Sequence, residues 1–318
     1  MGMFNYESAY SRFPAPAFSS VMNFSGGGSS GSPLGTAGLL TTTVWSLAIL
    51  PQIDQANTFN LYNSNLSDYD PANANAVKTV INAYLCPSTP RSGNTITFTN
   101  PYVVGTLSTS PVTLSSAGAN DYISTNQVDP SFVAYINSVS GTSIPNGNLQ
   151  GWATDGITVA GSLINTPTGG RIADITDGLS NTTMIGELAG RNVLYYTGNK
   201  IQPATNPLPA TPDSDGTWQF VCGGGAWADG TSGIWDLSGR NPDGTGVIGP
   251  CTINCSNSRS ALGGGNPLLN SAGLYSFHTG GAHVLFCDGS VRFLNSNINV
   301  ITMIGLITRQ NGETLGEF

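Results

Sequence analysis

The sequence of 318 residues predicts an α+β protein, with helices near both ends of the chain and strands and loops between them. Near the ends, apolar residues recur at spacings of three and four, the period of an amphipathic helix. Between them, Thr, Val, Ser and Gly with frequent turn signals indicate strands. Charged residues make up only 9% of the chain, well below the usual share of about a quarter. This composition favours β-structure and long loops over a helical bundle.

The N-terminal helix is predicted over residues 1–14. Met3, Tyr6, Tyr10 and Phe13 form one stripe on its surface, and Pro14 ends it. A helix that begins with the first residues suggests that a segment normally precedes residue 1. Further helical structure is expected at 41–63, where Pro51 opens a second helical segment, at 73–85 and within 297–313.

Strands are expected between and after these helices. Residues 88–165 are predicted to be strands and loops. Residues 171–191 are predicted to begin as a short strand, turn at Asp177-Gly178 and continue as an apolar strand. Residues 283–294 predict a hairpin, because Asp288-Gly289 separates two alternating runs, and Asp-Gly favours a two-residue turn with two positive φ angles.

Two loop regions interrupt this pattern. Residues 25–35 are predicted to be a flexible Gly/Ser loop, and residues 199–268 a long insertion rich in Gly, Pro and Trp. A chain of this length can bury a substantial core. We expect one domain that spans residues 1–318.

Charge and cysteine content exclude some partners and leave others open. Ten basic against eighteen acidic residues give a net charge of −8, so no basic patch for nucleic acid is expected. The five cysteines leave at least one thiol unpaired in a monomer. Cys251 and Cys255 can close a local disulfide, and no second pair of ligands lies near them in the sequence for a zinc site.

The stretch SFHTGGAHVLFCDGSVRF, residues 276–293, holds both histidines of the chain. Ser276, His278 and Asp288 are the candidate catalytic residues, as an acid–base or nucleophilic set. Ser276 and His278 are two apart, so on one strand they would share a face. A triad also requires an oxyanion hole and an elbowed nucleophile, and the sequence shows neither. The alternatives are that His278 and Asp288 bind a metal, or that His278 is structural and bonds Asp288 or a turn carbonyl.

Asp174 and Asp177 are candidate calcium ligands. Both precede the turn at Gly178, and closely spaced oxygen ligands around a glycine turn can hold Ca²⁺. The spacing differs from that of an EF-hand loop. The alternative, which we prefer, is an Asx-rich turn whose side chains bond their own backbone.

Several segments carry a resemblance to a known family. FHTGGAHVLFCDGSVRFL has a His, nine intervening residues and Asp-Gly, and resembles the C-terminal H-X9-DG signature of bacterial prepilin-like proteins, a family of unknown function. NYESAYSRFP, VWSLAILPQIDQANTFNLYN, YLCPSTP and RIADITDGLSNTTMIGE resemble other segments of that family, in the same order along the chain. GPCTINCSN and the final helix also fit.

The resemblance implies a pilin-like fold, in which a truncated N-terminal helix packs on an antiparallel sheet with long loop insertions. It implies that residues 1–14 are the remnant of a longer helix, whose apolar part anchors the full-length form in the inner membrane. It places the chain outside the cytoplasm, at the cell surface or in the periplasm. The partners implied are other pilin-like subunits or secretion machinery. The family offers no established catalytic residues.

Three functions are therefore weighed. The first is a pilin-like or pseudopilin-like structural or interaction protein, a subunit of a type IV pilus or a type II secretion-like assembly. The second is an extracellular hydrolase of esters or polysaccharides that uses Ser276, His278 and Asp288. The third is a binding module stabilised by calcium at Asp174 and Asp177. We prefer the first, and expect the chain not to be an enzyme.

Overall fold

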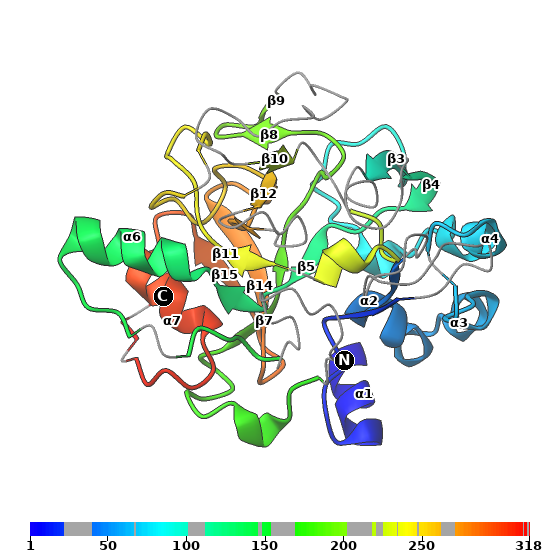
Figure 1. Ribbon diagram of the computed structural model, residues 1–318, viewed down its shortest axis with the longest axis horizontal. Coiled ribbons are helices and arrows are strands. Elements are labelled where there is room, and N and C mark those ends of the chain that lie inside the picture. The colour runs from blue at the N-terminus through cyan, green and yellow to red at the C-terminus, as the bar shows by residue number, and fades with distance from the viewer. Residues whose placement is uncertain are drawn as a thin grey trace, which may run out of the picture.

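The computed structural model shows an α+β protein (Figure 1). It describes residues 1–21, 40–66, 68–100, 112–145, 148–153, 169–201, 218–220, 225–233, 235–246, 248–261, 271–313, 315–316 and 318. The predicted Gly/Ser loop at 25–35 lies outside the described residues, as do parts of the insertion at 199–268.

A four-stranded antiparallel sheet lies at the centre of the fold, in the order β15-β14-β7-β5. Its strands are β5 (Tyr122–Ser124), β7 (Thr183–Glu187), β14 (Gly281–Phe286) and β15 (Val291–Asn295). Successive side chains of a strand point to opposite faces. On β14, Val284 and Phe286 contribute to one hydrophobic core, while the neighbouring Leu285 packs against a second one. The sheet therefore separates two cores.

Helices α6 (Pro130–Ser140) and α7 (Val300–Ile307) lie on one side of the sheet, and the N-terminal helices lie on the other (Figure 1). Asn299 caps α7 by accepting a hydrogen bond from the Ile301 N–H at 2.8 Å. The predicted C-terminal helix is confirmed. In contrast, α6 lies inside the range expected to hold only strands and loops, so that expectation was wrong at 130–140.

The N-terminal side consists of short helical pieces. These are α1 (Gly2–Tyr10), α2 (Trp45–Ala48), η1 (Leu50–Ile53), α3 (Ala56–Leu61), η2 (Pro71–Asn73), α4 (Ala74–Val77) and η3 (Asn82–Tyr84). Helix α1 ends where Ser11 takes a left-handed conformation, with φ of 56°. It packs on η1, because a Cβ at Gly2 would come within 2.7 Å of the Ile53 side chain.

The continuous helix predicted at 73–85 is interrupted. Thr79, Val80 and Ile81 are β-branched, which lowers their preference for a helix. The Thr79 carbonyl accepts a hydrogen bond from the Trp227 indole N–H at 2.8 Å, and Ile81 is extended. Trp227 is fully buried. A tertiary contact from the insertion therefore replaces the helix in this segment.

A second sheet is mixed rather than antiparallel, in the order β10-β12-β13-β11-β6. Its strands are β6 (Gln127–Val128), β10 (Trp218–Phe220), β11 (Asp236–Leu237), β12 (Arg259–Ala261) and β13 (Ser271–Ala272). Three two-stranded ribbons complete the β-structure: β1 (Ala17–Val21) with β2 (Leu40–Val44), β3 (Thr95–Asn100) with β4 (Val112–Gly118), and β8 (Tyr195–Tyr196) with β9 (Lys200–Ile201). A short 3₁₀ helix, η5 (Gly230–Gly233), lies in the insertion.

Two local predictions need correction. The segment expected to be a short strand before Asp177 is a 3₁₀ helix, η4 (Ile172–Asp174), in which Asp174 bonds back to the Arg171 N–H. The predicted hairpin is confirmed as β14 and β15, but Gly289 has a positive φ of 88° and Asp288 does not. The Phe286 N–H bonds the Ser290 carbonyl at 2.9 Å, so the connection is longer than a two-residue turn.

Among the helices that the structure describes, none combines the length and the apolar character that crossing a membrane requires.

Candidate functional site

His278 lies at the centre of a polar cluster that three distant segments build. Its Nε2 is 3.3 Å from Glu187 Oε1 and 3.5 Å from Cys86 Sγ. Its Nδ1 is 3.3 Å from the Ser88 hydroxyl. The imidazole is 26% exposed, so solvent reaches one side of the cluster.

Strand register places Glu187 beside the histidines. Glu187 is the last residue of β7 and pairs with Tyr122 of β5, while the preceding Gly186 pairs with Val284 of β14. His283 is therefore the cross-strand neighbour of Glu187. The His283 N–H donates to Glu187 Oε2 at 2.7 Å, and His283 Nδ1 is 3.7 Å from the same oxygen. The carboxylate is only 2% exposed, and it faces two imidazoles.

A buried aspartate fixes the segment that carries Cys86. Asp121 precedes β5, and its Oδ2 accepts the Cys86 N–H at 2.8 Å. Its Oδ1 accepts the Gly190 N–H at 3.0 Å and forms an ion pair with Arg91. The Asp121 N–H in turn donates to the Tyr84 carbonyl at 2.9 Å. Cys86 is thereby held on the sheet beside Glu187.

The Cys86 thiol is buried, and its burial raises its pKa above the usual value. The nearby Glu187 and Asp121 carboxylates raise the pKa further, because they disfavour a second negative charge. A cysteine acts as a nucleophile through its thiolate. The environment of Cys86 therefore does not activate it for nucleophilic attack.

In the part of the chain that the structure describes, the imidazole of His278 contacts Cys86, Ser88 and Glu187, and neither Ser276 nor Asp288. The Ser276 hydroxyl donates to the Gly281 carbonyl at 2.9 Å and accepts the His278 N–H at 2.9 Å. Asp288 lies beyond the far end of β14, where it accepts the Ser290 N–H at 2.8 Å and lies 3.8 Å from Arg292. The structure thus brings His278 together with Cys86 and Glu187.

Asp174 and Asp177 bond to different parts of the chain. The partly exposed Asp174 forms an ion pair with Arg171 at 2.8 Å, which holds the pKa of this carboxyl below its usual value. The Asp177 carboxylate accepts the N–H groups of Asn311 and Gly312 at 2.7 and 3.0 Å. Both carboxylates thus have hydrogen-bond partners from the protein.

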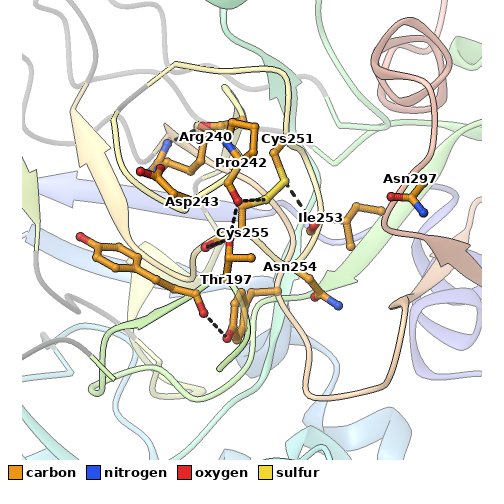
Figure 2. Close-up of a disulfide and its surroundings, with 12 residues drawn as sticks. Thr197, Arg240, Pro242, Asp243, Cys251, Ile253, Asn254, Cys255 and Asn297 are labelled. Carbon is orange, nitrogen blue, oxygen red and sulfur yellow. Dashed lines mark hydrogen bonds between the residues drawn. A yellow bond between two sulfur atoms is a disulfide. The ribbon is translucent and has the colours of Figure 1, made fainter. Parts of the chain in front are cut away.

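Cys251 and Cys255 form a disulfide, with their Cα atoms 6.2 Å apart (Figure 2). The backbone of Cys251 pairs with that of Arg240, and the Thr197 hydroxyl donates to the Pro242 carbonyl at 2.7 Å. Asn254, inside the closed loop, has a positive φ of 63°. The bridge closes a tight turn at the point where the insertion packs on the β8–β9 ribbon.

Removing this disulfide by the double change Cys251→Ser and Cys255→Ser is expected to lower the free energy of unfolding by about 2 kcal/mol. The cost is modest because the bridge constrains only a short loop of the unfolded chain. Urea unfolding of the variant and the wild type measures this difference. Reductant should lower the stability of the wild type to that of the variant. With five cysteines and one disulfide, the oxidised chain should show no more than three thiols in denaturant. Five thiols would contradict the pairing.

The chain is thus an α+β protein that has a local disulfide and a cluster of one cysteine, one histidine and one glutamate. Residues 1–300 match the family described as "Protein of unknown function (DUF1559)", and the chain belongs to this family. No curated protein and no solved structure matches the chain.

Sequence reasoning missed Cys86, Ser88 and Glu187 as neighbours of His278. All three lie in segments quoted for the family resemblance: Cys86 and Ser88 in YLCPSTP, and Glu187 in RIADITDGLSNTTMIGE. A search for residues able to bind His278 could have begun with these segments.

Proposed function

We propose that the chain is a pilin-like or pseudopilin-like structural or interaction protein outside the cytoplasm, a subunit of a type IV pilus or type II secretion-like assembly. The family match along residues 1–300 and the ordered motifs support this proposal. So does a fold in which an N-terminal helix precedes an antiparallel sheet. An apolar helix N-terminal to residue 1 would hold the full-length form at the inner membrane, as the resemblance implies.

The observation that carries the proposal is the edge of the central sheet. Within the part of the chain that the structure describes, β15 pairs with β14 on one side only. Val291 and Phe293 on this strand are 63% and 44% exposed. An edge strand offers unpaired backbone groups, and exposed apolar side chains beside them favour contact with another protein. We assign this edge to a neighbouring pilin-like subunit.

The disulfide supports the location. Disulfides persist in the periplasm and at the cell surface, while the cytosol keeps most thiols reduced. The Cys251–Cys255 bridge therefore favours an extracytoplasmic protein. The hydrolase alternative is not taken further, because the Ser276 hydroxyl donates to a backbone carbonyl rather than to His278.

Cell fractionation and cross-linking test this proposal. The chain is expected in the membrane, periplasmic or sheared surface fraction, cross-linked to other pilin-like subunits. The double change Val291→Lys and Phe293→Lys should abolish the cross-links and leave the melting temperature nearly unchanged, because both side chains are exposed. Leu61→Lys is the matched control, since Leu61 is equally exposed but lies on α3. A purely cytoplasmic chain would contradict the location, and cross-links unaffected at the edge would contradict the assigned surface.

A further inference from the structure

A thiol, an imidazole and a carboxylate converge in the polar cluster. Cys86 Sγ, His278 Nε2 and an oxygen of Glu187 all lie within 4.8 Å of one another. In tetrahedral zinc sites with the usual bond lengths, neighbouring N and O ligands are about 3.3–3.5 Å apart, and S and N ligands about 3.5–3.6 Å apart. The cluster has 3.3 Å between N and O, and 3.5 Å between S and N. We propose that Cys86, Glu187 and His278 bind a zinc ion.

The surrounding hydrogen bonds orient each proposed ligand toward a common point. The Ser88 hydroxyl is placed to accept a hydrogen bond from the Nδ1–H tautomer of His278, which leaves the Nε2 lone pair facing Cys86 and Glu187. The His283 N–H occupies Glu187 Oε2 and leaves Oε1 toward His278. Asp121 holds the backbone of Cys86. Zinc sites use such outer partners to fix the tautomer and direction of their ligands.

Charge balance also favours a divalent cation. Glu187 is almost fully buried, and the two imidazoles beside it balance its charge only when they are protonated. A buried carboxylate without a counter-charge is costly. The nearby guanidinium of Arg91 pairs with Asp121 instead. Zinc binding would add the Cys86 thiolate to the Glu187 carboxylate, giving two negative charges against two positive ones. The ion would therefore neutralise both buried groups.

The ligand types select the ion. Ca²⁺ and Mg²⁺ prefer oxygen ligands, whereas a mixed S, N and O set suits Zn²⁺ and related transition metals. His278 and His283 are partly exposed, so water reaches the cluster and can take the fourth position. The His283 ring stands edge-on to His278, with ring centroids 4.7 Å apart. We place the His283 ring next to the fourth coordination position of the zinc ion rather than among the zinc ligands.

Metal titration of the purified full chain, first stripped with chelator, tests this inference independently of any pilus function. The wild type should bind about one zinc per chain, as a single site requires. Co²⁺ should give a thiolate-to-cobalt charge-transfer band in the near ultraviolet. Cys86→Ala and His278→Ala should lose both signals. Ser88→Ala should weaken binding by about tenfold, the size expected for an outer partner.

Cys287→Ala is the matched control, because Cys287 is the other free, buried cysteine of the described residues. This variant should keep the zinc and the cobalt band. If Cys86→Ala fails to fold, zinc should still protect Cys86 of the wild type from alkylation. No zinc bound at micromolar concentration, zinc retained in both folded ligand variants, or a cobalt complex without the thiolate band would each overturn the inference.

Discussion

Asp121→Ala should lower the free energy of unfolding by about 3–5 kcal/mol, as expected when one partner of a buried ion pair is removed. Asp121 is 1% exposed and joins three segments through its carboxylate. Without it, the Arg91 charge loses its partner, and the N–H groups of Cys86 and Gly190 lose their acceptor. A buried donor left unsatisfied costs more than an average hydrogen bond contributes.

Urea unfolding in the presence of chelator measures this loss separately from any metal effect. Asp174→Ala is the matched control, because it also removes an aspartate paired with an arginine. That pair lies at the surface, with Arg171 62% exposed, and surface ion pairs contribute little because water and salt screen them. If the two variants lost the same stability, Asp121 would not be the buried anchor of the Cys86 segment.

Local signals in the sequence predicted those elements whose stabilising contacts are also local. The Asp-Gly pair at 288–289 indicated the β14–β15 hairpin, and Val300, Ile304 and Ile307 indicated α7. The helix expected at 73–85 failed because Trp227, nearly 150 positions away, binds the Thr79 carbonyl. The pattern of apolar residues within the segment itself gives no indication of that contact.

The candidate site shows the same difference between local and distant contacts. His278 was a candidate from the sequence, and its proposed partners were its sequence neighbours Ser276 and Asp288. The structure instead gives it Cys86 and Glu187, 192 and 91 positions away. The register of β7 against β14 decides that Glu187 faces His283 and His278, and a shift by one residue would place it on the opposite face. The spacing of residues along the chain does not reveal how β7 pairs with β14.

Helix α6 was missed although its start carries a recognisable signal. Asp129 caps it by accepting the Ser131 N–H at 2.7 Å, and Pro130 occupies the first turn. Phe132 and Ile136 then lie four apart, on the face that packs in the core shared with α7. The many Thr, Ser and Gly residues around this helix dominated the prediction for the whole range.

Phe132→Ala is therefore expected to lower the free energy of unfolding by about 3–5 kcal/mol, the usual cost of removing a buried aromatic ring. Phe132 is fully buried and belongs to the core that includes Trp235 and Leu306. The loss combines the transfer free energy of the ring with the cost of the cavity that it leaves in this core. Urea unfolding at one temperature measures it.

Val139→Ala on the same helix is the control, because Val139 is 60% exposed and surface changes stay within about 0.5 kcal/mol. Both substitutions change the intrinsic helix preference of α6 by a similar amount. The difference between the two variants therefore measures how much the packing of α6 on the core stabilises the protein. If Phe132→Ala cost no more than Val139→Ala, α6 would not be part of the core. The face of the four-stranded sheet that bears Val284 and Phe286 would then be covered by α7 without α6.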